Sequence, residues 1–361
     1  MKQRRYILIA LAFWGMYSFS ESRYLAAEIL KYAKLPLREL EVQQNVKFCE
    51  FGGAELFLDF VRLKRKAYKD MGAVIFVHGD LISGDRKGEA LALAKAAAAR
   101  GYLGVTIDYR LSGDMRSDNN PDNDRLQVGA RFPAPVLDVR CAIRWVRAQH
   151  EALGLHPGKI VVGGVGTGGY LALMAGLSGE GKKMPNVGDL SAEARRATND
   201  VRAVLNLGGA TDTTAQYWFE RTKRFRGTRQ IASLVGDSPA GNQRLYTVSS
   251  PISFINDKSA PVFTFHGTAD YVFPYDAAIT LDEEMKKKGV PHTLMTLPAV
   301  GYEFKGRDGK VNSRALKQVL DRAFQFLEVS MRYDPASIIA KRQEELQKEL
   351  KKEQPKDDDW W

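Results

Sequence analysis

Cysteine and histidine are scarce in this chain, and its apolar runs are shorter than a membrane-spanning helix requires. The 361 residues include 2 Cys and 5 His. Two cysteines are too few for a disulfide framework, and neither stands in the paired spacing of a zinc site. Cys141 lies in an apolar helical stretch (VRCAIRWV), which favours a core position, and a bridge between Cys49 and Cys141 is left open.

The amino end has a basic start (MKQRR) and then an uncharged run over residues 6–20 (YILIALAFWGMYSFS). The run is shorter than the roughly 20 residues that span a bilayer, so we expect no stable membrane span. The pattern predicts a signal peptide over residues 1–20 and a secreted or periplasmic protein. An uncleaved signal anchor and a buried amino-terminal helix are the alternatives.

Charge of one sign is not concentrated in a long stripe, although the formal net charge is +10. Acidic residues are interleaved with most of the basic ones, as in the Lys/Glu segment near the carboxyl end. Nucleic-acid binding is therefore not expected. Hydrophobic residues make up 44% of the chain, which is enough for a large core in one α/β domain or two smaller ones.

The order of apolar segments predicts an α/β fold. Residues 42–63 alternate around a Gly-Gly pair, which predicts an antiparallel hairpin. Short apolar runs then alternate with helical periods, which predicts a mainly parallel sheet with helices on both faces and no internal repeat. The expected strands cover residues 73–77, 103–107, 160–162, 201–207, 262–265 and 293–297. The expected helices cover residues 86–100, 134–150, 168–177, 275–288 and 312–330.

Two polar segments interrupt this alternation and are expected to be loops, residues 111–131 and 178–200. We divide the rest into a helical lead-in over 21–44, the α/β domain over 45–330 and a charged helical tail over 331–361. The tail ends in Trp360 and Trp361, so it is either a solvated helix or a segment that docks on a partner.

Four expected strands end in loops that carry chemistry. The first ends in His78-Gly79-Asp80 and another in the glycine turn GVGTGG, at Gly164–Gly169. Two more end in HGTAD, which contains Asp270, and in Gly301-Tyr302. Because the carboxyl ends of parallel strands meet at one edge of a sheet, we expect these loops to converge there.

The order of these motifs resembles that of the α/β-hydrolases, most closely the lipase and carboxylesterase group that includes acetyl-xylan and feruloyl esterases. The resemblance covers about residues 45–330. It also includes Phe132-Pro133-Ala134, Asp138, Arg144-Trp145 and Ser250-Pro251-Ile252. It implies a serine at the glycine turn, then an acid, then a histidine.

This chain departs from that catalytic pattern at two of three positions. The resemblance places the nucleophile at Gly166, the acid at Asp270 and the histidine at Tyr302. Glycine has no side chain that could attack a carbonyl. A tyrosine with an ordinary pKa of about 10 is a poor general base at neutral pH.

The resemblance also implies an oxyanion loop and a pocket, at Gly79, Asp80, Val165 and Thr167. The family's loop is rich in glycine, whereas Asp80 here brings a carboxylate that opposes a developing negative charge. Since the turn residue of this fold is normally strained by roughly 1 to 3 kcal/mol, glycine at 166 would relieve that strain.

Other residues could supply different chemistry. Thr167 is a substitute nucleophile only if the motif shifts by one residue, and Ser83 fits a turn. The residues Asp80, Asp85 and Asp270 could form a carboxylate cluster, but we predict no metal and no other cofactor. The histidines His78, His266 and His292 are expected to be structural.

These observations predict an esterase-like protein that has lost serine-hydrolase activity and binds a small molecule, a carbohydrate or a partner at the former active site. The first alternative is weak hydrolysis of acetyl or aryl esters of carbohydrates by Thr167 or by water activated at Asp270. The second is a scaffold that docks through its tail. The oligomeric state is left open.

Overall fold

The structure is a computed structural model. It describes residues 23–33, 39–51, 53–64, 69–81, 86, 88–112, 130–179, 190–222, 224–225, 229–236, 238–332 and 344. The expected signal peptide over 1–20, the residues Ser83 and Asp85, and the end of the tail with its two tryptophans lie outside this range.

An eight-stranded sheet forms the centre of the molecule, with the strand order β1-β2-β4-β3-β5-β6-β7-β8. The first two strands and the β2–β4 pair are antiparallel, and all other neighbours are parallel. The strands are β1 Leu40–Phe51, β2 Ala54–Leu63, β3 Met71–Val77, β4 Leu103–Ile107, β5 Leu155–Val165, β6 Ala203–Leu207, β7 Val262–Gly267 and β8 His292–Leu297. The predicted α/β fold with an antiparallel amino-terminal hairpin is confirmed.

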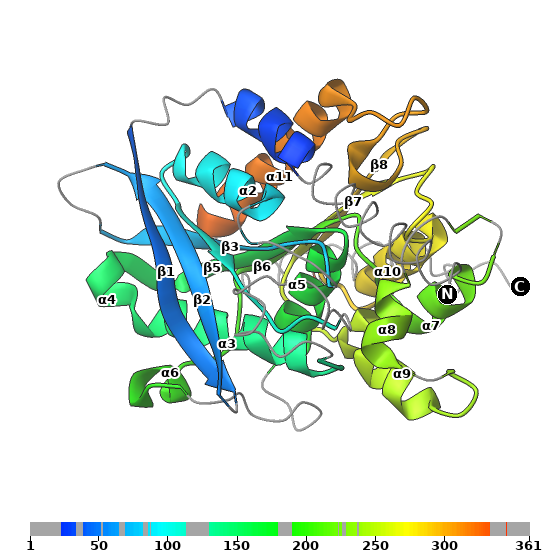
Figure 1. Cartoon of the computed structure of the whole chain (residues 1–361), viewed down its shortest axis with the longest axis horizontal. Coiled ribbons are helices and arrows are strands. Elements are labelled where there is room, and N and C mark those ends of the chain that lie inside the picture. The colour runs from blue at the N-terminus through cyan, green and yellow to red at the C-terminus, as the bar shows by residue number, and fades with distance from the viewer. Residues whose placement is uncertain are drawn as a thin grey trace, which may run out of the picture.

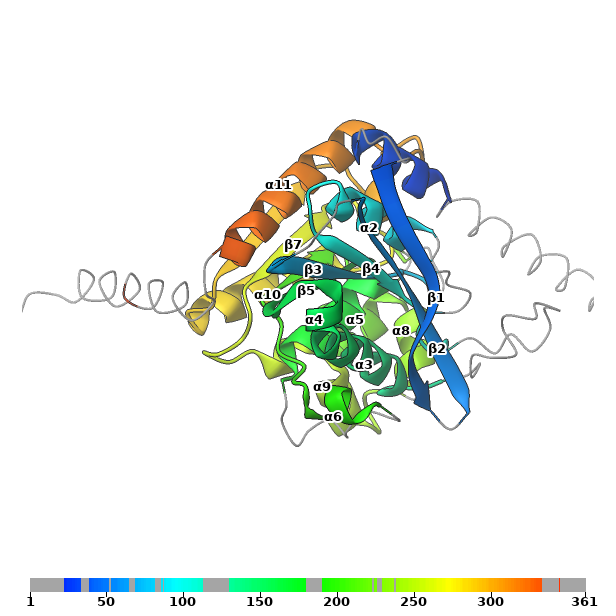
Figure 2. The same cartoon turned by 90° about the vertical axis from the view of Figure 1, so that its left-hand side faces the viewer.

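Helices cover both faces of this sheet (Figures 1 and 2). A helix over 23–33, α2 (Glu89–Ala98) and α11 (Ser313–Arg332) pack on one face around a core that contains Leu25, Phe76 and Leu320. On the other face α3 (Ala134–Ala148), α5 (Thr167–Leu177) and α10 (Tyr275–Lys287) enclose a second core. Continuous burial of β3, β4 and β6 follows from this double cover.

The structure differs from the sequence-based expectation at several boundaries. The described part of the helical lead-in covers residues 23–33, and β1 begins at Leu40, inside the predicted 21–44 segment, because Leu40 pairs with Leu63 of β2. The predicted loop over 178–200 contains a short helix, α6 (Ala192–Arg196), whose first turn is capped by Ser191.

Three helices between β6 and β7 were not expected from the sequence. They are α7 (Thr213–Phe219), α8 (Gln230–Val235) and α9 (Gln243–Ser249), followed by a short 3-10 turn at Pro251–Phe254. The segment mixes basic, aromatic and small residues without a clear helical period, so its helices depend on contacts with one another and on the Asp212 cap of α7. We call residues 213–249 the cap.

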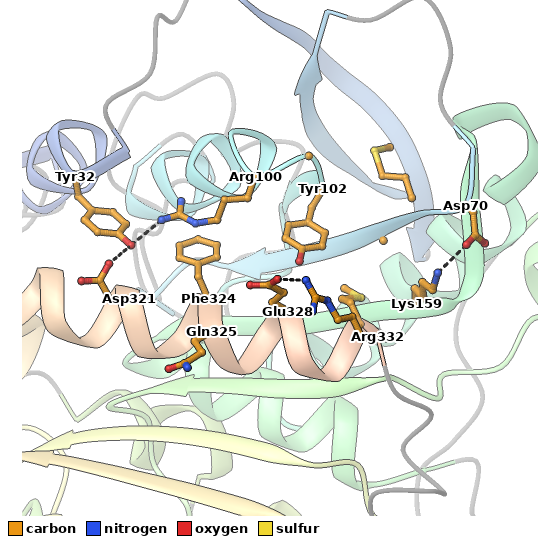
Figure 3. Close-up of a pocket in the computed structure, with 14 residues that line it drawn as sticks. Tyr32, Asp70, Arg100, Tyr102, Lys159, Asp321, Phe324, Gln325, Glu328 and Arg332 are labelled. Carbon is orange, nitrogen blue, oxygen red and sulfur yellow. Dashed lines mark hydrogen bonds and ion pairs between the residues drawn. The ribbon is translucent and has the colours of Figure 1, made fainter.

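A cleft of about 690 Å³ opens at the amino edge of the sheet, between α2, α11 and the helix over 23–33 (Figure 3). Its charged side chains already form hydrogen bonds or ion pairs with other residues that line it. Tyr32 donates to Asp321, and Arg100 donates to the Tyr32 hydroxyl, 2.8 and 2.6 Å apart respectively. Lys159 pairs with Asp70 at 2.8 Å. Because Met71 and Gly72 at the amino end of β3 line the cleft, it lies at the edge opposite the loops that carry the chemistry.

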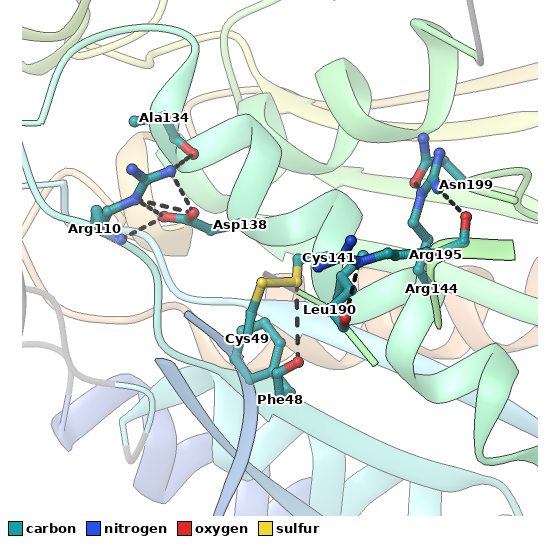
Figure 4. Close-up of a disulfide and its surroundings, with 10 residues drawn as sticks. All are labelled: Phe48, Cys49, Arg110, Ala134, Asp138, Cys141, Arg144, Leu190, Arg195 and Asn199. Atoms are coloured by element: carbon teal, nitrogen blue, oxygen red, sulfur yellow. Dashed lines mark hydrogen bonds and ion pairs between the residues drawn. A yellow bond between two sulfur atoms is a disulfide. The ribbon is translucent and has the colours of Figure 1, made fainter. Parts of the chain in front are cut away.

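A disulfide joins Cys49 of β1 to Cys141 of α3 across a sequence separation of 92 (Figure 4). The expectation that Cys141 is a core residue holds as well, since its side chain is fully buried. Close by, the buried Arg110 guanidinium binds Asp138 of α3 with a shortest contact of 2.7 Å. Both links fix α3 against the edge of the sheet and hold the end of β4 in place.

Candidate functional site

Gly166 forms the sharp turn between β5 and α5. Its backbone has φ 54° and ψ −121°, a conformation in which a side chain is strained. The Gly166 N–H donates to the Leu207 carbonyl at 3.0 Å, which holds the turn above the sheet. At Gly168 a Cβ atom would lie 2.0 Å from the Val77 carbonyl oxygen, so only glycine lets α5 approach β3 this closely. The sequence therefore builds the turn that the resemblance implies.

The Tyr302 ring fills the space next to Gly166. A Cβ atom at position 166 would lie 2.8 Å from both the hydroxyl oxygen and Cε2 of Tyr302, closer than carbon atoms pack without a shift. The ring is held between Tyr271 and Phe273, at centroid distances of 6.4 and 5.8 Å. Glycine at 166 and tyrosine at 302 thus fit each other, and any side chain at 166 would require the ring to move.

The loop that carries Tyr302 is fixed by its own strained backbone and by stacking. Glu303 and Phe304 have φ values of 52° and 61°. The Phe304 ring stacks on Phe265 of β7 at 4.8 Å, and the Gly301 N–H donates to the Lys305 carbonyl at 2.8 Å. Because tertiary contacts hold these unfavourable angles, the Tyr302 side chain has little freedom to leave the space.

Asp270 lies in the loop after β7 and is 6% exposed. Its Oδ1 accepts hydrogen bonds from the N–H groups of Val272 and Phe273, at 2.7 and 2.8 Å. Burial raises the pKa of Asp270 to about 7, against the lowering effect of these two bonds. Its Oδ2 is 3.8 Å from Nε2 of His266.

The two histidines at strand ends are buried and neutral. Burial lowers the pKa of His78 to about 3 and that of His266 to about 4. His78 stacks on Tyr109 at 4.1 Å, and Nε2 of His266 lies 3.2 Å from the Phe273 carbonyl oxygen. His292 bonds Asp282 and Thr264 through its two ring nitrogens, at 2.8 and 2.9 Å. These contacts agree with the prediction that all three histidines have structural roles.

Negative charge surrounds the Tyr302 hydroxyl. Burial raises the pKa of Tyr302 well above its ordinary value, and the carboxylates of Glu303, Asp80, Glu89 and Asp270 raise it further. The phenol therefore stays protonated at neutral pH. Among the described residues, however, no three His, Cys, Asp or Glu side chains are grouped as a metal site requires.

The loop after β3 uses its N–H groups inside the protein. The Gly79 N–H donates to Glu89 of α2 at 2.8 Å, and the Leu81 N–H donates to Oε1 of Gln230 at 3.3 Å. Thr167, which is fully buried, donates its hydroxyl to the same Gln230 oxygen at 2.6 Å. The Gln230 amide thus connects the cap, the first residue of α5 and the loop after β3.

A second chain of contacts connects the cap to Asp270. Nε2 of Gln216 in α7 donates to the Val272 carbonyl at 2.8 Å and to Oε1 of Glu220 at 3.2 Å. Burial raises the pKa of Glu220 to about 7, and a bond from the Ala232 N–H in α8 opposes that rise. Glu220 therefore ties the end of α7 to the start of α8, from which Gln230 extends.

The structure brings Gly166, Thr167, Asp270 and Tyr302 to one edge of the sheet, with Gly79, Asp80 and Val165 beside them. The oxygen of Val165 lies 2.7 Å from where a Cβ atom of Gly79 would be, so the two loops touch. Glu89, Gln216, Glu220 and Gln230 were missed from the sequence. Nothing local marks them, because their contacts are made to residues far away in the chain.

Comparison with known proteins agrees with this arrangement. Residues 58–285, more than half of the chain, match the model of the BD-FAE family. Esterase LipC of Mycobacterium tuberculosis is 26% identical over 255 residues, covering 70% of this chain and 58% of that protein. The probable carboxylic ester hydrolase LipM of the same organism is 24% identical over 279 residues, covering 74% and 59%. The chain thus spans somewhat less than two thirds of the length of these relatives.

Solved structures of esterases share the fold. A truncated carbohydrate esterase from gut microbiota superposes with a TM-score of 0.62 at 20% identity, covering 81% of this chain and 97% of that one. The butyrate-bound esterase Est2 of Thermogutta terrifontis gives a TM-score of 0.61 at 22% identity, covering 81% and 94%. In the described part of this chain no helix is both long and apolar enough to cross a membrane. On its matched segment and its sheet, the chain belongs to the BD-FAE family of carboxylesterase-type proteins with the α/β-hydrolase fold.

Proposed function

We propose that this protein is a family member that has lost serine-hydrolase activity and binds a ligand or partner at the former active site. The observation that carries the proposal is the contact between position 166 and Tyr302. The phenol lies 2.8 Å from where a nucleophile's Cβ atom would be, and position 166 has no side chain. The space in which an acyl-enzyme would form is filled by the protein itself.

The protonated state of Tyr302 supports the same proposal. A base must be unprotonated and must reach the nucleophile or a water molecule. The pKa of Tyr302 is raised well above its ordinary value, so the phenol cannot accept a proton at neutral pH. His266 is neutral, but its Nε2 faces the Phe273 carbonyl within a buried pocket of side chains.

The state of the loop after β3 is a third support. Stabilisation of an oxyanion requires backbone N–H groups that point at the developing charge. The Leu81 N–H instead faces the Gln230 amide oxygen, and the Gly79 N–H faces the Glu89 carboxylate. A ligand carbonyl would have to displace the Gln230 amide oxygen before it could accept a hydrogen bond from the Leu81 N–H.

A second candidate function is ester hydrolysis by an unorthodox route, which the names of the esterase relatives favour. Thr167 is a poor nucleophile for it, because the hydroxyl donates to an amide oxygen and not to a base. Asp270 is the better starting point, since a carboxyl group with a pKa of about 7 is half ionised at neutral pH. The substrates would be acetyl or aryl esters of carbohydrates.

We also propose that the protein works outside the cytosol, in a secreted or periplasmic form. The basic and apolar start of the sequence and the Cys49–Cys141 bridge support this location, since disulfides persist in oxidising compartments. The ligand at the former active site would then be a small molecule or a carbohydrate. Docking through the charged tail stays a separate hypothesis.

Hydrolysis of p-nitrophenyl acetate tests the proposal. We compare the native protein with the restored variant Gly166→Ser/Tyr302→His and with Gly166→Ala/Tyr302→His, which has the same backbone strain and the same space but no hydroxyl. We expect the native protein and the alanine control to match the buffer rate, and the restored variant to exceed both by about 100-fold or more. Native turnover that disappears in Asp270→Asn would overturn the proposal in favour of the second candidate.

A further inference from the structure

The sequence of the cap has an excess of basic residues, and no step of the proposed function uses that charge. Between residues 213 and 250 there are six Lys or Arg residues and two Asp or Glu residues. Five of the six basic residues fall between 221 and 229. Such an excess on a short segment attracts anions and raises their local concentration.

Trp218 of α7 stands beside this charge and is 54% exposed. In the described part of the cap it is the one large apolar side chain that is exposed; Tyr24, Val42 and Val329, the others in the described residues, lie on other elements. The Trp218 ring meets the buried Tyr217 ring edge-on at 5.1 Å. The Trp218 ring therefore packs on the buried Tyr217 ring and exposes its outer face to solvent.

Three exposed arginines follow Trp218 in the cap, at positions 221, 224 and 229. The Arg221 guanidinium lies 3.2 Å from the centre of the Tyr217 ring, the same ring that Trp218 contacts, and Arg221 also donates to the Tyr217 carbonyl at 2.9 Å. Arg224 lies 5.8 Å from the Phe219 ring. Arg229 is exposed one residue before α8. None of the three forms a close ion pair with a described acid, although the charges of Arg221 and Arg229 act on the buried Glu220 and lower its pKa against the larger effect of burial.

Stacking holds the guanidinium of Arg221 in place before any ligand arrives. A guanidinium on an aromatic ring keeps its edge free, and that edge presents paired N–H donors that match a carboxylate. The nearby acid, Glu220, is 2% exposed and bonded within the cap, so it does not cover the arginines from the outside. The surface is thus preorganised and positively charged.

We propose that Trp218, Arg221, Arg224 and Arg229 form a binding surface for an acidic polysaccharide. A sugar ring would stack on Trp218, and the carboxylates of neighbouring uronate residues would bind the three guanidiniums. This surface adjoins the candidate site, because Gln230 follows Arg229 directly and reaches Thr167 and Leu81. The cap would therefore hold a polymer chain beside the former active site.

Two other anionic partners fit the surface less well. A membrane surface is bound by several apolar side chains inserted together, and the described cap exposes one. Single-stranded nucleic acid is bound on successive aromatic platforms along a basic groove, whereas the described part of the cap exposes one aromatic ring, Trp218. A glycan needs a single ring to stack on and carboxylates within reach of the arginines.

Affinity electrophoresis of the full chain in gels that contain polygalacturonate tests the proposal. We expect the native protein to be retarded at low salt, and we expect Trp218→Ala to weaken the affinity by about tenfold, as truncation of a central aromatic residue does. The variant Arg221→Gln/Arg224→Gln/Arg229→Gln should weaken it at least as much. Thermal unfolding of each variant shows that it is folded.

Matched controls separate this surface from general charge. Tyr24→Ala removes an equally exposed aromatic ring from another helix, and Lys286→Gln/Lys287→Gln/Lys288→Gln removes three charges from the end of α10. Both should change the affinity less than about twofold. Polygalacturonate contains no ester group, so this result does not depend on whether the protein hydrolyses esters.

Several results would overturn the proposal. The first is a native protein that is not retarded by polygalacturonate at low salt. The second is equal loss of affinity in the α10 control, which would mean attraction by net charge alone. The third is an unchanged affinity in Trp218→Ala. The fourth is tighter binding to oligo-dT or to phosphatidylglycerol vesicles than to polygalacturonate, which would assign the surface to a nucleic acid or a membrane.

Discussion

A double-mutant cycle between positions 166 and 302 examines the contact on which the account depends. In the native protein, Gly166→Ala places a Cβ atom 2.8 Å from the Tyr302 hydroxyl and also places alanine at φ 54°. The backbone strain costs roughly 1 to 3 kcal/mol, and the overpacking costs a further 1 to 3 kcal/mol. After Tyr302→Ala the ring is gone, so only the backbone strain remains.

The coupling free energy between the two changes is therefore expected to be about 1 to 3 kcal/mol. It is obtained from the free energies of unfolding of four proteins in urea, followed by circular dichroism. Gly101→Ala is the matched control, because Gly101 has a φ of 86° and no atom within 4 Å of its absent Cβ. It carries the backbone strain without the contact and should not couple to Tyr302. A coupling below about 0.5 kcal/mol at position 166 would refute the reasoning.

Three further predictions follow from other parts of the molecule. Cys49→Ser/Cys141→Ser lowers the free energy of unfolding by about 4 to 5 kcal/mol, because the unfolded chain loses a loop constraint, and an unchanged urea midpoint would contradict this. Burial raises the pKa of Asp270 to about 7, so its favourable contribution is present below pH 4 and is lost as the pH rises through 7. The native protein should thus lose roughly 4 kcal/mol relative to Asp270→Asn between pH 4 and 8, whereas a constant difference would argue against it. Adding Gln230→Ala to the restored variant frees the Leu81 N–H and should raise p-nitrophenyl acetate turnover by about tenfold or more; no gain would mean that this N–H is not an oxyanion donor.

The sheet and its main helices could be predicted from the sequence because apolar periodicity is local. The runs at 103–107 and 262–265 became β4 and β7, and the helical period at 134–150 became α3. The cap could not be predicted, since its three short helices hold each other and show no period of their own. Apolar periodicity arises where one face of an element is buried, and because the cap is only partly buried its sequence lacks that pattern.

The candidate site, like the fold, could be predicted from the sequence only in part. Gly166, Asp270 and Tyr302 could be placed from motifs in chain order, and the structure brings the first and last of them into contact. The sequence did not reveal that the Tyr302 ring takes the space of a nucleophile, because that depends on the path of the loop after β8. It did not reveal Gln230 either, since a glutamine in a polar segment carries no sign of the distant N–H that it binds.

Under the proposed function, this chain differs from a working hydrolase in the side chains of its site. The chain has a glycine turn, a buried acid and a strained loop, and the resemblance implies that Gly166 and Tyr302 stand where a serine and a histidine would act on an ester. Tyr302 lies against position 166, and Gln230 accepts a hydrogen bond from the Leu81 N–H, which we propose to be a donor that such a reaction would use. A scaffold of this kind is stable without catalysis, because filling a site removes buried space and unpaired polar groups.

Covalent labelling by a fluorophosphonate tests the central claim most directly, because the reagent reports a reactive hydroxyl whether or not a substrate is known. The protein is incubated with the probe and its intact mass is measured, alongside the restored variant and its alanine control. The account predicts no mass increase for the native protein or the control, and one adduct at position 166 in the restored variant. An adduct on the native protein that disappears after Thr167→Val would contradict the account, because it would show a working nucleophile beside Gly166.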